Sequence, residues 1–541
     1  MKGSYIIPKA GIYINQSGYR PSDSKIALVP CDADYFEIYG VDGTFIDIKP
    51  LTGGNQRPDP NSGEILKTAN FSHLVKPGAY FLQAGDLRSP VFEVKQDAYQ
   101  NLTASLVKFF YYQRCGGEGI KAEHCGKTFA HPSCHTEPAV YYDQQDFIYG
   151  LDEVDVSGGW HDAGDYGRYV TPGVKAAADL LLACEHFPVL NTLNIGLPHS
   201  LLDEVRYEIR WLLKMQHPET GGVYHKVTTE YHAPMNKLPE DDRQQLYLAP
   251  VSAPATGDFA AVMAYAARMM AKSDPEFSRK CLEASKKAWQ WLMAHSDVDG
   301  YTDPDFFKTG KYGDKSSSDE RFWAAAELYK TTGEECYKSY MTDNPIPSFG
   351  LGWANMGTYA INTLLTTPQL SKTDPLYIKA KETLLKDAAD IMAIRAENGF
   401  GIGLNRFVWG SNMDVANCAM LLLMADRVQP DKDYVCAAKD HIDYLLGRNP
   451  MGISYVTGCG QHAARYPHHR PSMTLGTTVP GMLVGGPNAS IKKIGCDPAA
   501  LLVPENTPPM KCYIDMYGSF ALNEICIYWN SPLVYAIGAF L

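Results

Sequence analysis

The feature that most constrains the fold of this chain is a change in the spacing of its apolar residues near residue 100. Before that point, short apolar or alternating runs are separated by turn residues. These runs are KIALVP (25–30), YFEIYG (35–40), TFIDIK (44–49), GAYFLQAG (78–85) and PVFEVK (90–95). Runs of this length between Gly, Pro and Asn are typical of β-strands. They predict a small β-sandwich over residues 12–96.

From about residue 102 onward, the apolar residues recur with helical spacing. About a dozen segments show it: 103–115, 174–187, 201–216, 257–272, 277–296, 318–332, 335–342, 355–367, 376–398, 412–427, 433–447 and 519–540. Gly and Pro concentrate in long connections, notably 151–173, 447–490 and 496–510. Long loops in a helical domain are usually functional or poorly ordered. The pattern indicates either a closed double ring of helices or an open α-solenoid, and periodicity does not decide between them.

Length and charge narrow the class of protein. A chain of 541 residues predicts two or three domains rather than one core. The net charge of −12 argues against a nucleic-acid partner. No stretch is long enough to span a membrane, and the first residues contain no apolar run of signal-peptide length. We therefore expect either a protein that works inside the cell or a secreted one whose signal peptide is missing here.

The segment SGGWHDAGDYGRYV (157–170) contains two aspartates, Asp162 and Asp165, among several glycines. Glycine lets the backbone turn tightly, so both carboxylates can converge on one point. Two such carboxylates can hold a water between them, which suits a general base or a metal site. The alternative is an Asp-rich loop that caps the helix beginning near Pro172. Trp160 is either a platform for stacking a sugar or a core residue.

A second carboxylate of interest is Glu524, in the apolar segment YIDMYGSFALNEICIYWNS (513–531). Burial among apolar side chains would raise its pKa and keep it protonated, as a general acid requires. The alternative is a helix glutamate that faces solvent or pairs with an arginine. A polar carboxylate pair and a remote carboxylate in apolar surroundings together match the needs of glycoside hydrolysis.

Three segments resemble motifs of glycoside hydrolase family 9. Residues 158–166, GGWHDAGDY, resemble the family's base motif, and 454–470 and 513–531 resemble its first and second signatures. Two positions depart from the usual pattern. His462 stands where Asn, Lys or Arg is usual, and Cys526 where a small Ser, Thr or Ala is usual.

The resemblance implies roles for five residues. Asp165 is implied as the catalytic base, Asp162 as its water-positioning partner and Glu524 as the general acid. His468 and Arg470 are implied in the substrate cleft. It also implies inversion at the anomeric carbon, for which the acid and base carboxyls lie roughly 6.5–9.5 Å apart.

The resemblance also implies a fold. GIYINQSGYRPSDSKIALV (11–29) resembles the immunoglobulin-like module that precedes the catalytic domain in one branch of the family. We expect a mainly α fold, with an immunoglobulin-like β-sandwich at 1–98 and an (α/α)6-barrel catalytic domain at 99–541. That barrel fits the helices counted above.

Thirteen cysteines, an odd and scattered number, do not look like a disulfide framework. Two thiols and two imidazoles are the best zinc ligands: Cys115, Cys134, His135 and His161. Four such ligands would make a closed structural site, and the resembling branch carries a zinc held by two Cys and two His. His124, Cys125 and His131 lie close by in the sequence and leave the choice open.

Calcium is a further expectation. DKSSSDERFWAAAELY (314–329) resembles the family's calcium-binding loop, with Asp319 and Glu320 as oxygen ligands. The alternative is a helix start, because Ser318 followed by two acidic residues is also a good N-cap. No organic cofactor is expected.

Two further residues are substrate-binding candidates by position. Trp409 can stack on a sugar face, and His225 lies on a loop between helices. Each also has a packing interpretation, which we favour for His225.

The resemblance implies an endo-β-1,4-glucanase (cellulase) acting on β-glucan or cello-oligosaccharides, secreted and, we expect, monomeric. One alternative is an exo-acting β-glucosidase or glucosaminidase of the same family, with loops 116–156 or 226–256 blocking the cleft. Another is a non-catalytic carbohydrate-binding protein.

Overall fold

The computed structural model describes residues 5–6, 11–54, 57–143 and 153–541. The chain forms two compact units. Unit 1 comprises residues 1–109, 193–196 and 388–541, and unit 2 comprises 110–192 and 197–387. Part of the predicted loop 116–156, residues 144–152, lies outside the described residues. Within the described part, no helix is both long and apolar enough to cross a lipid bilayer.

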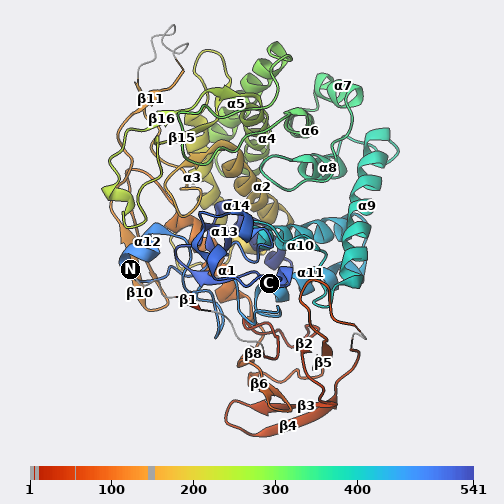
Figure 1. Cartoon of the computed structure of the whole chain (residues 1–541). Coiled ribbons are helices and arrows are strands. Elements are labelled where there is room, and N and C mark those ends of the chain that lie inside the picture. Colours follow the sequence, from red (N-terminus) through yellow and green to blue (C-terminus); the bar gives the residue numbers. More distant parts are fainter. Residues whose placement is uncertain (1–4, 7–10, 55–56, 144–152) are drawn as a thin grey trace. The chain divides into compact units, whose positions relative to one another are not determined.

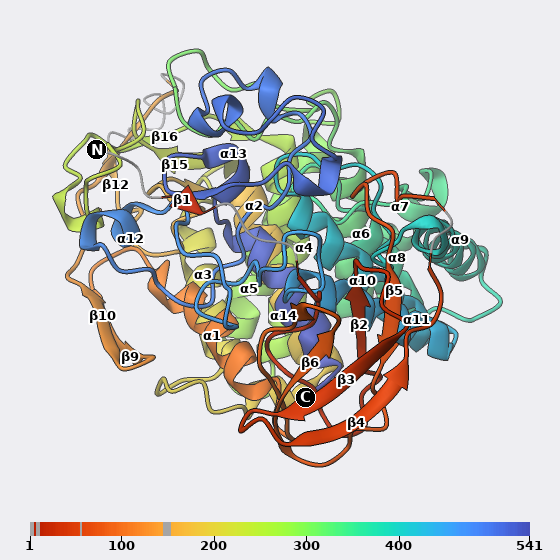
Figure 2. The ribbon, with the colours of Figure 1, turned by 60° about the horizontal axis from the view of Figure 1, so that its bottom comes forward.

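Unit 1 begins with two antiparallel sheets, red and orange in Figures 1 and 2. Their strands are β2 (Ile26–Val29), β3 (Tyr35–Gly40), β4 (Phe45–Pro50), β5 (Lys67–Asn70), β6 (Gly78–Ala84), β7 (Leu87–Arg88) and β8 (Phe92–Val94). β2 pairs with β5, whereas β3 lies between β4 and β6, and β6 also pairs with β7 and β8. Alternate residues of β3, Phe36 and Ile38, are buried in a shared core, as a two-residue side-chain period requires.

The helical part of unit 1 is built on three packed helices, α10 (Ser411–Val428), α11 (Lys432–Leu445) and α14 (Ile527–Gly538). α10 and α14 are apolar and buried over most of their surface. The short helices α12 (Arg470–Leu475) and α13 (Phe520–Asn523) also belong to this unit, as does the pair of strands β1 (Tyr5–Ile6) and β18 (Asp515–Met516). Helices α1 (Gln100–Tyr112) and α9 (Pro375–Glu397) each include a residue where the chain passes between units.

Unit 2 is organised around α4, which packs against α2, α5 and α6. Its helices are α2 (Val170–His186), α3 (Leu201–Lys214), α4 (Ala253–Met270), α5 (Pro275–Ala294), α6 (Ser318–Thr332), α7 (Glu335–Asp343) and α8 (Gly357–Leu365). Local sequence explains their ends. Ser200 and Asp203 form a capping box at the start of α3, and Gly333 ends α6 at φ +71°, which favours glycine.

Short strands in unit 2 pair segments that connect its helices. A five-stranded sheet has the order β12 (Glu153–Val154), β11 (Ala139–Tyr141), β16 (Tyr247–Leu248), β15 (Lys226–Thr228) and β13 (Arg168–Tyr169). Two separate pairs complete the set: β9 (Ile120–His124) with β10 (Lys127–His131), and β14 (Val223–Tyr224) with β17 (Val251–Ser252).

The helices expected from periodicity are present within a few residues of their predicted bounds. One prediction is corrected, because the segment 519–540 is two helices rather than one. The chain is extended between α13 and α14, where Glu524 and Ile525 form isolated β-bridges with His468 and Val484. The interruption falls on the predicted general acid.

Candidate active site and metal centre

The loop with the two predicted aspartates belongs to unit 2 and follows a tight turn. Gly158 and Gly159 have φ values of +107° and +75°, a region that side-chain-bearing residues rarely adopt. A Cβ atom on Gly159 would lie 2.6 Å from the Trp211 ring. Glycine is therefore required here by both the backbone conformation and the packing.

Backbone and side-chain hydrogen bonds close this loop on itself. The Asp162 amide donates to the Gly167 carbonyl at 2.9 Å, and the Gly167 amide donates to Asp165 Oδ2 at 3.1 Å. Both aspartates are largely buried, with exposed fractions of 2% and 8%. Each also has a tyrosine donor: Tyr312 Oη contacts Asp162 Oδ2, and Tyr169 Oη lies 3.5 Å from Asp165 Oδ2.

Sequence reasoning missed Tyr312, which stands 150 residues after Asp162 in a loop without periodic signal. Its backbone is in the left-handed region at φ +47°. Its carbonyl lies 3.0 Å from His225 Nε2, and His225 Nδ1 lies 2.8 Å from Ser252 Oγ. His225 thus holds the segment that carries Tyr312.

The surroundings of His225 agree with the packing interpretation favoured above, and its contact with substrate stays a prediction. The imidazole is fully buried and stacks on Tyr301 with ring centroids 3.7 Å apart. Burial, helped by the neighbouring Lys226 charge, lowers the pKa of His225 to about 3. A neutral, enclosed ring of this kind holds a loop in place.

The burial of Trp160 favours the core interpretation over the sugar-platform one. Its side chain is 1% exposed and packs on Phe110 at 5.0 Å between ring centroids. The indole N–H donates to Glu204 Oε1 at 3.0 Å, and the Trp160 amide donates to Glu208 Oε2 at 2.7 Å. Trp160 anchors the aspartate loop to α3.

Glu524 belongs to unit 1, where it is half-buried at the break between α13 and α14. The Trp409 indole N–H donates to Glu524 Oε2 at 3.0 Å. The Trp409 ring packs near Phe520, with centroids 5.3 Å apart, and the side chain remains 44% exposed. Trp409 thus contacts the predicted acid while presenting an aromatic surface to solvent.

The two C-terminal signatures meet at this carboxylate. The His468 amide donates to the Asn523 carbonyl at 2.7 Å, which places His468 beside Glu524. Asp515 accepts from the amides of Arg465 and Tyr466 at 2.8 and 2.9 Å. Burial raises the pKa of Asp515 to about 6.

Arg470, the second predicted cleft residue of the first signature, begins α12 and is 5% exposed. It lies two residues after His468, whose Nδ1 is 2.8 Å from the Tyr517 carbonyl oxygen. Its contact with substrate stays a prediction, as do the roles of Asp162, Asp165 and Glu524 and the expected separation of acid and base.

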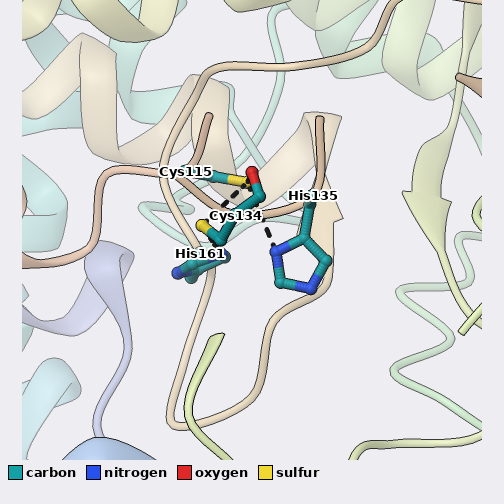
Figure 3. Close-up of side chains that lie close together, drawn as sticks. All are labelled: Cys115, Cys134, His135 and His161. Carbon is teal, nitrogen blue, oxygen red and sulfur yellow. Dashed lines mark hydrogen bonds between the residues drawn. The ribbon is translucent and has the colours of Figure 1, made fainter. Parts of the chain in front are cut away.

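The four predicted zinc ligands come together in unit 2 (Figure 3). The thiol and imidazole ligand atoms of Cys115, Cys134, His135 and His161 all lie within 4.8 Å of one another, and all four residues are buried. The two Sγ atoms are 4.0 Å apart. Two thiolates on one tetrahedral zinc, with Zn–S bonds of 2.3 Å, would stand roughly 3.8 Å apart.

The ligand chemistry also fits a metal ion. His135 Nδ1 lies 3.7 Å from Cys115 Sγ, and His161 Nε2 lies 4.0 Å from Cys134 Sγ. Burial lowers the pKa of His161 to about 4, so the ring is neutral, as a metal ligand must be. Nearby His124, Cys125 and His131 lie outside this group.

An outer carboxylate faces this cluster. Asp242 Oδ2 lies 3.5 Å from His135 Nε2, with both side chains almost fully enclosed. The non-ligand nitrogen of a metal-bound histidine usually faces a carboxylate, which fixes the tautomer. His135 itself adopts φ +48°. Sequence reasoning missed Asp242, which lies over 100 residues away in an acidic PEDD segment.

A second group in unit 2 is made only of carboxylates. Asp319 and Glu320 begin α6, as the N-cap interpretation allows, but Glu320 is fully buried and faces Asp258 of α4 and Asp314. Both oxygens of Asp258 and of Glu320 are buried without a hydrogen-bond partner among the described residues. Burial and mutual repulsion raise the pKa of Asp258 and Glu320 well above their ordinary values. Such a group suits a hard cation with oxygen ligands.

The chain is similar to known proteins over nearly its whole length. Residues 99–537 match glycosyl hydrolase family 9, and residues 8–89 match the cellulase N-terminal ig-like domain. The chain is 36% identical to a cellodextrinase of Butyrivibrio fibrisolvens, over 98% of this chain and 99% of that protein.

Two solved structures are similar over nearly their whole length. A thermostable endoglucanase mutant of Alicyclobacillus acidocaldarius is 36% identical with a TM-score of 0.88, covering 98% of this chain and 99% of that one. A zinc-binding triple mutant of the endoglucanase J30 is 30% identical with a TM-score of 0.89, covering 96% and 99%.

This likeness confirms the predicted fold class, an (α/α)6 barrel preceded by a small immunoglobulin-like domain. It also removes the alternative of a non-catalytic carbohydrate-binding protein, since the matched family consists of hydrolases. The chain belongs to glycosyl hydrolase family 9 and is a glycoside hydrolase.

Proposed function

We propose that this enzyme is an endo-β-1,4-glucanase that inverts configuration, with Asp165 as base, Asp162 as its partner and Glu524 as acid. The observation that carries the proposal is the pair of buried aspartates closed into one loop, each with its own tyrosine donor. Carboxylates held this rigidly are preorganised to orient a water, which is what an inverting base must do.

The chemistry follows from the side chains. Glu524, when protonated, gives its proton to the glycosidic oxygen as the bond to the anomeric carbon breaks. A water oriented by Asp162 attacks that carbon from the opposite face, and Asp165 takes the water's proton. Trp409 supports this assignment, because it contacts Glu524 and exposes a ring that a sugar can stack on.

The pH dependence of kcat/KM follows from these two roles. Activity is lost at low pH when Asp165 becomes protonated and at high pH when Glu524 loses its proton, which gives a bell-shaped profile. Asp165→Ala and Glu524→Gln should each abolish turnover while the circular dichroism spectrum stays that of the wild type. Full activity in either variant contradicts the assignment.

A second candidate is exo-acting hydrolysis of short oligosaccharides. It is favoured by the similarity to a protein named cellodextrinase. Product analysis on carboxymethylcellulose and on cellopentaose separates the two. Rapid viscosity loss with mixed oligomers supports endo action, whereas monosaccharide release from the pentamer with intact polymer supports exo action.

We further propose that the Cys115, Cys134, His135 and His161 cluster holds structural zinc. The distances among the ligand atoms support this, and Asp242 would orient His135 through its outer nitrogen. Because His161 immediately precedes Asp162, the ion would brace the aspartate loop. The metal content of the purified protein, one zinc per chain, tests this.

The carboxylate group Asp258, Asp314, Asp319 and Glu320 is proposed to hold calcium. Buried like charges without donors destabilise a fold unless they are protonated or bind a cation. The enzyme is proposed to act as a monomer on β-glucan or cello-oligosaccharides, which sedimentation in the presence and absence of cellotetraose tests.

A further inference from the structure

His232 approaches the proposed catalytic base from a different element. It lies in the loop 229–246 that follows β15, and its Nδ1 is 3.2 Å from Asp165 Oδ2. We infer that His232 is a positioning residue for Asp165: it donates from Nδ1 to this carboxylate and holds it in the orientation that accepts a proton from water. The inference rests on the proposed role of Asp165 as base.

The loop is held so that His232 faces the aspartate. Thr229 Oγ1 donates to the Tyr231 carbonyl at 2.6 Å, and the Lys308 amide donates to the Glu230 carbonyl at 2.8 Å. On the other side of His232, Tyr166 Oη donates to the Lys237 carbonyl at 2.6 Å. Tyr166 is the residue after Asp165, so the base loop and the histidine loop are tied together directly.

Three donors therefore converge on one carboxylate oxygen. Asp165 Oδ2 lies 3.1 Å from the Gly167 amide, 3.5 Å from Tyr169 Oη and 3.2 Å from His232 Nδ1. Gly167 and Tyr169 belong to the aspartate's own segment, whereas His232 belongs to another. A donor from a separate element restrains the rotation of the Asp165 side chain more than contacts within its own segment do alone.

Charged groups around Asp165 and His232 have opposite effects on the ionised form of Asp165. The positive charge of Lys226 stabilises the ionised form of Asp165. The negative charge of Asp162 destabilises it, because both aspartates lie close enough to act on Tyr169. Asp242 and His135 line the same small cavity as Asp165 and His232. A hydrogen-bond donor on a carboxylate stabilises its ionised form, so losing His232 makes the base easier to protonate.

His232 keeps one face in water, with 40% of its side chain exposed, while Asp165 is 10% exposed. Solvent weakens a pair of this kind, so we expect a moderate effect. The competing role is substrate binding by the exposed face of the imidazole. That role affects KM, whereas positioning of the base affects kcat.

Two substitutions separate these roles. His232→Asn keeps an N–H donor near the position of Nδ1, and His232→Leu keeps bulk without a donor. On cellotetraose, we expect His232→Leu to lower kcat roughly three- to tenfold with little change in KM, and His232→Asn to stay within about twofold of wild type. The acidic limb of the kcat/KM profile should move to higher pH in His232→Leu.

The control variant is His73→Leu. His73 is 43% exposed and its Nε2 lies 3.0 Å from Asp47 Oδ2 in the N-terminal part of the chain, so it is matched in exposure and pairing. This variant should have wild-type kinetics. Thermal melting of all variants verifies that they fold.

Three outcomes overturn the inference: wild-type kcat in His232→Leu, a rise in KM alone, or an equal loss in both His232 variants without movement of the acidic limb. Asp165→Asn distinguishes these from failure of the proposed function. If Asp165→Asn is fully active, Asp165 is not the base. If it is inactive while His232→Leu equals wild type, only the role of His232 is wrong.

Discussion

At the scale of single residues, Glu208 supports the aspartate loop although it has no proposed catalytic role. It lies on α3, is 1% exposed and accepts the Trp160 amide at 2.7 Å. Its other oxygen has no hydrogen-bond partner in the described part of the chain. Burial raises the pKa of Glu208 from 4.5 to about 8, so the carboxyl is neutral at pH 7.

This pKa predicts a pH-dependent stability difference for Glu208→Gln. Below pH 4.5, Glu208 is protonated in both the folded and the unfolded wild type, so it costs no stability. As the pH rises from 4.5 to about 8, the unfolded chain releases this proton while the folded protein keeps it, and the free energy of unfolding falls. Glutamine has no such loss. In urea unfolding, the free energy of unfolding of Glu208→Gln minus that of the wild type should increase by up to about 1.4 kcal/mol per pH unit across this window and level off above it. A constant difference contradicts the prediction.

Asp242→Asn makes a second prediction at this scale. The amide keeps the shape but removes the charge that faces His135 Nε2. Loss of an outer-shell carboxylate typically weakens metal affinity by about 10- to 100-fold. Zinc release to a chromogenic chelator should therefore occur at a lower chelator concentration than in the wild type. The exposed neighbour Asp241→Asn serves as the control and should behave as wild type.

At the scale of elements, α4 and α6 meet at two buried carboxylates. A Cβ on Gly257 of α4 would stand 2.6 Å from the Glu320 Cβ, so glycine permits the close approach. That approach brings Asp258 towards Glu320. Two buried carboxylates at such a helix crossing destabilise it unless they are protonated or bind a cation.

Asp258→Asn should accordingly have opposite effects with and without calcium. In chelator, the variant lacks one of the repelling charges and should melt at a higher temperature than the wild type. With calcium, the wild type should gain more in Tm than the variant, because a ligand has been lost. Melting curves with EGTA and with millimolar calcium measure both. An unchanged calcium-induced shift in the variant would show that Asp258 is not a ligand.

The elements also show what sequence could predict. Helices from α1 to α11 were found by their apolar period, since a 3.6-residue repeat reports directly which face is buried. The break at Glu524 was missed, because the flanking residues are apolar on both sides and the pattern continues through it. What opens the helix is long-range pairing of Glu524 and Ile525 with His468 and Val484, which no local pattern reports.

Some residues of the candidate site could be predicted from sequence, and others could not. Asp162, Asp165 and Glu524 were selected because each lies in a compact motif that resembles one of the family, and the zinc candidates because a Cys-His pair, Cys134 and His135, marks that stretch. The catalytic roles stay predictions. Tyr312, His232 and Asp242 were missed because they reach the site from irregular loops distant in sequence. Trp160 and His225 each had a sugar-binding and a packing interpretation from sequence, and their burial favours packing.

At the scale of the whole molecule, the segment that precedes the N-terminal sheets contacts a buried ionic centre in the helical part of unit 1. Asp443 of α11 accepts from Asn15 Nδ2 at 2.7 Å and pairs with Lys439 and, at 3.8 Å, with Arg448. The Gln16 amide adds a hydrogen bond to the Leu446 carbonyl at 2.9 Å. The N-terminal part is thus joined to the helices by buried polar contacts.

Asp443→Ala should weaken this connection strongly. It leaves Lys439 and Asn15 facing a cavity without their acceptor, and removing one partner of a buried ion pair typically costs about 3–5 kcal/mol. Urea unfolding measures this. Asp433→Ala, on the exposed side of the same helix, should stay within about 0.5 kcal/mol of wild type. Equal effects would show that the connection contributes no more than a surface residue.

The proposed acid is tested by the activity of Glu524→Gln on two substrates that differ in their leaving group. Hydrolysis of cellotetraose needs a proton on the leaving oxygen, whereas 2,4-dinitrophenyl β-cellobioside releases a stable anion and does not. If Glu524 is the general acid, kcat should fall about 10²- to 10⁴-fold on cellotetraose and change little on the activated substrate. Equal losses on both substrates, or full activity on cellotetraose, would show that Glu524 is not the general acid.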